Sequence, residues 1–260
     1  MRRMLIILRL FWGTSLAAEL EYRLNFICSA ITSLGNFIGS IFTLSLMYQK
    51  QYEFAGWPWE AALLVMGLFT FLDGVTNTFL SPNLSRIVQH VQKGTLDFIL
   101  LKPVDAQFWL SLRNISPWGL PNLTFGVILT AYAGARLGLT ARHYLLAAGP
   151  IVLSIVILYA LWYLLATTTI WFTKIYNITE VLRAMTDASR FPRAAYPVVW
   201  QFVFTFIIPV LFLTTVPAET MRYGTYGWWV VAEALLALGL FIAARVFWRV
   251  ALRSYTSASS

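Results

Sequence analysis

The sequence predicts an all-α, polytopic membrane protein with six transmembrane helices. Of its 260 residues, 59% are hydrophobic and only 12% are charged, which is about half the charged fraction of a soluble domain. The apolar residues form stretches of about 20, the length that spans a bilayer. The basic residues concentrate between alternate stretches, as the positive-inside rule requires. The same composition excludes a disordered, collagen-like or coiled-coil chain.

The net charge of +8 has the same explanation. A basic soluble protein would suggest a nucleic-acid partner. Here the basic residues lie between apolar stretches, so topology accounts for them and no nucleic acid is expected. The single cysteine, Cys28, lies in an apolar stretch, which excludes an internal disulfide and a thiolate metal cluster.

Residues 1–22 are expected to form an amphipathic helix on the cytosolic side. A cleaved signal peptide is the alternative, because Arg2 and Arg3 precede a short apolar run and residues 15–18 resemble a cleavage site. Arg9 interrupts that run, and no hydrophilic mature domain follows it. We therefore expect one transmembrane domain over residues 1–260, with the six-span bundle at 23–253 and a flexible tail at 254–260.

Six stretches are long and apolar enough to cross the membrane, namely 24–47, 59–79, 116–135, 144–172, 198–216 and 227–248. The third contains Pro117 and Pro121, so its start should be bent or broken. The fifth contains Pro209 and ends at Pro217, which suits a short helix followed by a kinked or re-entrant segment.

The distribution of Lys and Arg orients these spans. With the N-terminus inside, 15 of the 19 basic residues lie on inner segments and 4 lie on outer ones. This asymmetry places both termini in the cytosol.

The first inner loop predicts a short amphipathic helix over residues 82–93. One face is apolar and carries Leu84, Ile87, Val88 and Val91. The opposite face is polar and carries Arg86, Gln89, His90 and Lys93. Ser81 is a candidate N-cap, Pro82 suits the first helical position, and Gly94 suits the end of the helix.

The second inner loop repeats this pattern. Its apolar face carries Ile178, Val181, Leu182 and Met185. Asn177 and Glu180 match a capping box, and the helix should end before Phe191 and Pro192. The residues expected to face away from the apolar side are Thr179, Arg183 and Asp187. Both inner helices could lie flat on the inner leaflet or could dock a cytosolic partner, and their spacing does not decide between the two.

Two acidic residues, Asp73 and Glu233, fall within predicted spans. They could form a proton relay if they lie close together, because ionisable groups in a membrane are costly and often functional. Alternatively, Asp73 bonds to neighbours such as Thr76 or Asn77, and Glu233 pairs across a helix or dimer interface. Gly35 and Gly39 form a Gly-x-x-x-Gly motif, which could serve internal packing or a dimer interface.

Catalytic motifs are missing from the sequence. It contains no phosphate-binding loop of the Gly-x-x-x-x-Gly-Lys-Ser/Thr type, so the chain is not expected to hydrolyse ATP or to be an enzyme. His90 and His143 fall on opposite sides of the membrane and cannot share a metal or a haem, and no cofactor is expected. An intramembrane aspartyl protease would need two facing aspartates, and only Asp73 lies in a span.

A family resemblance enters at residues 94–104, which read GTLDFILLKPV. This segment resembles the G-x-L-D-x-x-L-x-[RK]-P pattern of type-2 ATP-binding-cassette (ABC) exporter permeases, and looks most like a bacterial branch whose permeases are often encoded in pairs. Residues 21–26, 190–192, 196–197, 208–210 and 216–218 are similar to the same branch. Lys102 departs from the pattern, because relatives usually carry Arg there, and a bidentate contact is in doubt.

The resemblance implies an amphipathic N-terminal helix, six spans, re-entrant helices after the fifth, and a location in the bacterial cytoplasmic membrane. It implies two partners: a second permease chain and a dimer of cytosolic ATPase subunits that bind ATP and Mg²⁺. Helix 82–93 would be the coupling helix. The residues implied to couple to the ATPase are Arg86, Gln89, His90, Lys93, Gly94, Thr95, Leu96, Asp97, Lys102 and Pro103, with Glu180, Arg183 and Asp187 on the second inner loop.

Two functions from different classes follow. The first is the permease subunit of an ABC exporter, driven by ATPase partners. The second is a proton-coupled secondary carrier that works through Asp73 and Glu233. The sequence leaves the substrate open, and also whether the permease pair is a homodimer or a heterodimer.

Overall fold

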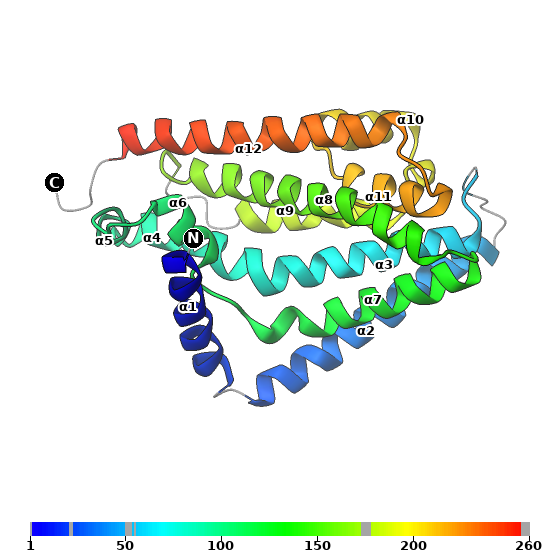
Figure 1. Cartoon of the computed structure of the whole chain (residues 1–260), viewed down its shortest axis with the longest axis horizontal. Coiled ribbons are helices and arrows are strands. Elements are labelled where there is room, and N and C mark those ends of the chain that lie inside the picture. The colour runs from blue at the N-terminus through cyan, green and yellow to red at the C-terminus, as the bar shows by residue number, and fades with distance from the viewer. Residues whose placement is uncertain (1, 21–22, 50–53, 55, 173–177, 256–260) are drawn as a thin grey trace.

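The computed structural model in Figure 1 describes the whole chain except residues 1, 21–22, 50–53, 55, 173–177 and 256–260. Every regular element in the described part is a helix. The longer helices are α1 (Arg2–Leu20), α2 (Arg23–Gln49), α3 (Trp59–Val75), α4 (Ser81–Gln92), α7 (Leu120–Arg136), α8 (Ala141–Thr168), α9 (Ile178–Thr186), α11 (Phe212–Tyr223) and α12 (Trp228–Ser254). The shorter ones are η1 (Thr76–Leu80), α5 (Asp97–Leu100), α6 (Ala106–Leu112), η2 (Pro117–Gly119), η3 (Asp187–Arg190), η4 (Arg193–Ala195), α10 (Val198–Phe202) and η5 (Val203–Ile207).

Four helices in the described ranges are long and apolar enough to cross a membrane. They are Leu24–Gln49, Trp59–Gln92, Ala141–Thr168 and Trp228–Ser254. A fifth candidate is the pair Val198–Ile207 and Phe212–Tyr223, if the two count as one span. The predicted spans 24–47, 144–172 and 227–248 are therefore confirmed as long apolar helices, whereas the total of six stays a prediction.

The second span and the predicted coupling helix are one continuous rod of 34 residues, Trp59–Gln92. The prediction that Ser81 caps a separate helix is wrong. The turn η1 is a π-helix, in which the Ser81 amide donates to the Thr76 carbonyl. Pro82 has no backbone N–H, so it cannot donate the helical hydrogen bond to the Thr78 carbonyl. The Ser116 amide donates to this carbonyl instead, at 3.0 Å. The helix therefore passes through Pro82 without ending.

The start of the third predicted span is broken, as its prolines indicated. Ser116 caps the single turn η2, its hydroxyl accepting from the Trp118 amide, and α7 then begins with Pro121 in its first turn. This helix has 17 residues, which at 1.5 Å per residue is the lower limit for crossing a bilayer.

The predicted fifth span, 198–216, is not a straight helix. Residues Val198–Ile207 and Phe212–Tyr223 form two helices that meet at an angle of 100°. Pro209 lies at the break between them, where the backbone at Ile208 is not helical. The kinked or re-entrant form that the sequence left open is therefore the observed one.

The second inner-loop helix is present as α9, and the helical stretch ends at Phe191 as predicted. The candidate cap Asn177 lies outside the described residues. The prediction that Arg183 faces away is wrong, because its guanidinium bonds to Asn77 and Ser81 on the long rod. Leu182 is buried as expected, but Val181 is exposed, so the apolar face is only partly covered.

The rod has the most buried surface of the candidate spans, and α2 has the least. α3 packs against α7, and α8 packs against α11 and α12. Glycines allow the α3–α7 approach, because a Cβ atom at Gly126 would lie 2.3 Å from the Phe71 amide nitrogen. Gly35 and Gly39 on α2 have no atom within 4 Å of such a Cβ, so the interpretation of their motif as internal packing is wrong.

One end of the bundle gathers α1, α4, α5, α6 and the C-terminal end of α12 (Figure 1). We call it the α5 end. The helix α1 runs across the other helices there, and its Trp12 indole donates to the Leu112 carbonyl at 3.1 Å. Ser15 likewise bonds to the Ile115 carbonyl at 2.8 Å. α1 is therefore bonded to the segment at the end of α6.

Candidate functional site

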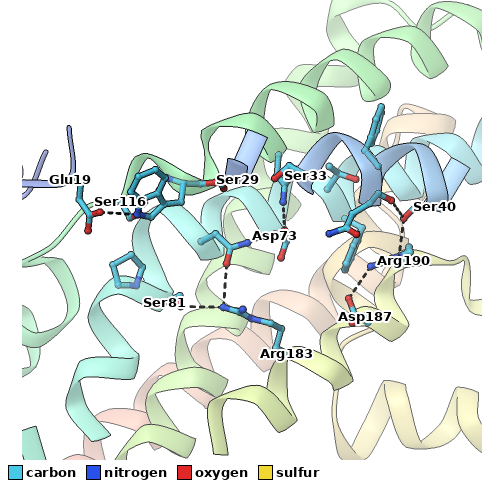
Figure 2. A pocket seen from close by; sticks show the side chains of 18 of the residues that line it. Glu19, Ser29, Ser33, Ser40, Asp73, Ser81, Ser116, Arg183, Asp187 and Arg190 are labelled. Carbon is cyan, nitrogen blue, oxygen red and sulfur yellow. Dashed lines mark hydrogen bonds and ion pairs between the residues drawn. The ribbon is translucent and has the colours of Figure 1, made fainter. Parts of the chain in front are cut away.

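A polar groove of about 610 Å³ lies between α2, α3 and the α9–η3 segment, and Figure 2 shows its lining. The side chains that form it are mostly hydroxyl, amide and charged groups. They include Glu19, Ser29, Ser33, Asn36, Ser40, Asp73, Asn77, Ser81, Arg86, Asn122, Arg183, Asp187 and Arg190, with Phe37, Phe69 and Trp118 as aromatic members. Polar surface of this extent within membrane helices requires an occupant or water, because unpaired polar groups are costly there.

Asp73 lies in the wall of the groove that α3 provides. One carboxylate oxygen, Oδ2, accepts from the Asn77 amide at 3.0 Å and from the Asn122 amide at 2.6 Å. The expected bond to Asn77 is therefore present, and a second donor comes from α7. Both donors meet the same oxygen, which fixes the orientation of the carboxylate.

Arg183 reaches the groove from α9, opposite Asp73 (Figure 2). It donates to Asn77 Oδ1 and Ser81 Oγ, both at 3.3 Å. The Glu180 carboxylate is 4.0 Å away and largely exposed. The hydrogen bonds of Arg183 are therefore long, and its acidic neighbours, Glu180 and Asp73, accept none of them.

Arg190 and Asp187 form a second charged group farther along η3. The Arg190 guanidinium lies 3.1 Å from the Asp187 carboxylate and donates to Ser40 Oγ, also at 3.1 Å. It also stacks on the Phe69 ring with 4.8 Å to the centroid. This arginine thus joins η3 to both α2 and α3.

The residues implied to couple to an ATPase lie around the α5 end, but not all of them are accessible. Gly94 ends α4 with a φ of 65°, and the Thr95 amide donates to the His90 carbonyl, so the predicted stop is confirmed. Arg86, Gln89, Lys93, Lys102 and Pro103 are exposed, and His90, Thr95 and Asp97 are half-buried. Leu96 is completely buried in the core.

The exposed apolar residues of this segment are ones that the sequence analysis did not single out. Phe98, within the short helix α5, is 69% exposed, and Leu101, directly after it, is 83% exposed. Lys102 lies beside them, with its ammonium 4.5 Å from the centre of the Trp109 ring. We call the residues Phe98, Leu101, Lys102 and Pro103 the tip.

A salt bridge ties the tip segment to α12. Arg245 donates to both carboxylate oxygens of Asp105, at 3.1 and 2.5 Å, and to Gln107 at 2.7 Å. Asp105 also caps α6 by accepting from the Phe108 amide. The hydrogen bonds from Arg245 hold the pKa of the Asp105 carboxyl below its usual value.

Glu233 lies apart from the groove. It is fully buried and accepts a hydrogen bond of 2.9 Å from Ser154 on α8, as an inter-helix pairing predicted. It does not line the groove that holds Asp73. The described residues contain no cluster of three or more His, Cys, Asp or Glu side chains that could hold a metal ion.

The groove itself was missed from the sequence, although α2 carried a signal. Ser29, Ser33, Asn36 and Ser40 recur at i, i+4, i+7 and i+11, which is one polar stripe on an apolar span. The contribution of η3 had no such signal, because Asp187 was assigned to contact with a cytosolic partner and no pattern in the sequence directs Asp187 or Arg190 toward α2 and α3.

Comparisons with known proteins agree with this architecture. A family model described as "ABC-2 family transporter protein" matches residues 34–259. No curated protein and no solved structure matches the chain. With several apolar helices, a polar groove among them and a family match over most of its length, the chain belongs to the ABC-2 transporter family and is a multi-pass membrane permease.

Proposed function

We propose that this chain is the permease subunit of an ABC exporter and that the groove is its part of the substrate path. The rod Trp59–Gln92 is the observation that carries the proposal. Asp73, Asn77 and Ser81 on the rod line the groove, and its C-terminal end leads into the tip at Phe98 and Leu101. A partner that moves the tip therefore acts on the groove through one rigid element.

The partner of the tip in this proposal is a dimer of cytosolic ATPase subunits. They would bind ATP and Mg²⁺, and this chain would bind no cofactor. ATP binding can shift the permease only if the ATPases hold one of its conformations more tightly than the other. The apolar side chains of Phe98 and Leu101 are suited to such a contact, because large exposed apolar side chains mark interaction surfaces. The α5 end is then the cytosolic end, with both termini inside.

The six crossings in this proposal differ from the predicted set at the fifth. Residues 178–196 run from the α5 end, where Arg183 contacts Ser81, to the opposite end, where Arg193 stacks on Trp229 at the start of α12. They form the fifth crossing, α7 forms the third, and the bent pair α10–α11 is re-entrant. Arginine in this crossing is tolerable because Arg183 and Arg190 face the groove rather than lipid.

A second permease chain covers α2 in this proposal. The face of α2 that points away from the groove exposes Ile31 and Ile38, and a Cβ atom at Gly35 or Gly39 would meet nothing within 4 Å. Small residues permit the close approach of another helix, and exposed apolar side chains offer it a packing surface. Whether the second chain is identical to this one is a question for the experiment.

A proton-coupled carrier is less well supported. Its relay needs Asp73 and Glu233 in one connected polar space. Asp73 faces the groove, while Glu233 is fully buried and bonded to Ser154.

The experiment is co-purification in mild detergent followed by measurement of ATPase activity. An ATPase and a second permease chain should accompany the wild-type protein. Leu101→Glu should abolish ATPase association. The matched control is Tyr226→Glu, at an exposed residue near the other end of the bundle, and it should leave association intact. Uphill transport by the isolated chain without companions would refute the proposal.

A further inference from the structure

We infer that the groove binds the zwitterionic head of an amphiphile, with an ammonium group beside Asp73 and an acidic oxyanion beside Arg183. This inference rests on the proposed function, in which the groove is the substrate path. It names the chemical class of that substrate from the charges that the groove leaves unmatched.

The other charged groups of the groove make hydrogen bonds of ordinary length within the protein. Arg190 is bonded to Asp187 and Ser40. Arg86 donates to Asn114 at 2.8 Å, and Glu19 accepts from the Trp118 indole at 2.8 Å. These groups shape the groove but have less to offer a ligand, because their strongest bonds are made within the protein.

Asp73 is different, because both of its protein donors occupy one oxygen. Asn77 and Asn122 donate to Oδ2, and Oδ1 accepts no hydrogen bond from the described residues. A carboxylate oxygen that faces a polar groove is suited to an ammonium donor.

Arg183 complements it across the same space (Figure 2). Its two hydrogen bonds are long and go to neutral oxygens, and its Nε atom is buried without a partner among the described residues. A phosphate or carboxylate oxygen would give this guanidinium the charged partner that it lacks.

The two groups together discriminate between classes of head group. A purely anionic head would be attracted to Arg183 but repelled by the Asp73 carboxylate. A purely cationic head would be attracted to Asp73 but repelled by the Arg183 guanidinium. A neutral polyol would leave both residues without a charged hydrogen-bond partner, because their mutual attraction across the groove is not a hydrogen bond. Only a head that carries both signs satisfies both residues, because specificity between ligands depends on the unpaired charges that the wrong ligand leaves.

The apolar part of the ligand follows from the position of the groove. Its α2 wall belongs to the least buried of the candidate spans, and Phe26 of α2 is 37% exposed and lies against Trp118, which lines the groove. Alkyl chains can lie against these aromatic side chains while the head occupies the groove. A free, water-soluble zwitterion would make no use of them.

The test measures lipid binding to the purified full-length chain, with the subunits that accompany it, by native mass spectrometry without ATP. The probes share their acyl chains and differ in the head: phosphatidylethanolamine, phosphatidylglycerol and diacylglycerol. Wild type should prefer phosphatidylethanolamine over phosphatidylglycerol roughly tenfold, the factor expected for one hydrogen bond to a charged group. Diacylglycerol should bind least.

The variants assign the preference to the two residues. Asp73→Asn should abolish it, and Arg183→Gln should weaken binding of both phospholipids, while Arg183→Lys should restore most of it. Glu60→Gln and Arg142→Gln make the same chemical changes outside the groove and should leave binding unchanged. Melting temperatures near that of wild type would show that each variant is folded.

Equal binding of the three lipids, or a preference that survives Asp73→Asn, would overturn the inference. Equal binding of glycerophosphoethanolamine, which has no acyl chains, would overturn its amphiphile part. The readout needs neither ATP nor a partner. A failure here with ATPase association intact therefore rejects the substrate class alone, and loss of association with lipid preference intact rejects the proposed function alone.

Discussion

Substitution of Gly126 by alanine tests the packing that brings α7 onto the rod. The added Cβ atom would lie 2.3 Å from the Phe71 nitrogen and 2.6 Å from its Cα. Both are backbone atoms, which cannot rotate away as a side chain can. Ordinary contacts need about 3.5 Å or more, so α7 must move by about 1 Å, a gap that forfeits a quarter to a half of each dispersion contact nearby.

The substitution should lower the free energy of unfolding by about 2–3 kcal/mol, which is the upper end of the range for overpacked cores. For a chain of this size, each kcal/mol corresponds to about 2–4 °C, so the melting temperature should fall by about 5–10 °C. The matched control is Gly239→Ala on α12, because a Cβ atom there also meets nothing within 4 Å. This control should melt at or slightly above the wild-type temperature, since alanine favours helix more than glycine does.

The assay is size-exclusion chromatography of the detergent-solubilised protein after heating, with equal expression as the check on membrane insertion. Apparent melting temperatures of the two variants that agree within about 2 °C would refute the packing argument. They would mean that α3 and α7 can separate without loss, and that the wall of the groove formed by Asp73 and Asn122 is not fixed by this contact.

Three further predictions concern the tip, the Asp105–Arg245 salt bridge and the buried Glu233. Leu101→Glu should lower the ATPase activity that co-purifies with the chain at least tenfold while the chain still inserts, and unchanged activity would exclude the tip as the contact. Asp105→Asn should lower the free energy of unfolding by no more than about 1 kcal/mol, because Asp105 and Arg245 are both about one-third or more exposed. The pKa of Asp105 is lowered in the folded chain, so this stabilisation is present above the unfolded value of about 3.9 and is lost as pH falls through the folded value. The difference between the two proteins should therefore be constant above about pH 4, shrink as the pH falls further, and vanish below the folded pKa; a difference that persists there would exclude the ion pair as its cause. Glu233→Gln should retain ATP-dependent transport because Ser154 can still donate to the amide oxygen, whereas abolished, pH-dependent flux without any ATPase would revive the proton-coupled carrier.

The sequence alone determined the class of the protein and most of its long helices. α2, α8 and α12 could be predicted from the length of their apolar stretches, because a helix surrounded by lipid must be apolar along most of its length. The buried face of α4, with Leu84, Ile87, Val88 and Val91, and the stop at Gly94 followed from helical periodicity and from the φ value that glycine permits. These are local properties, which a single sequence records.

Only the tertiary structure decided the continuity of the rod, the bend after α10 and the groove. Pro82 does not end its helix, because a carbonyl freed by the proline finds the Ser116 amide, which lies 34 positions farther along the chain. Arg183 joins Asn77 and Ser81 across about a hundred residues. No periodicity within one segment encodes such pairings, since each polar group finds its partner only when distant helices pack together.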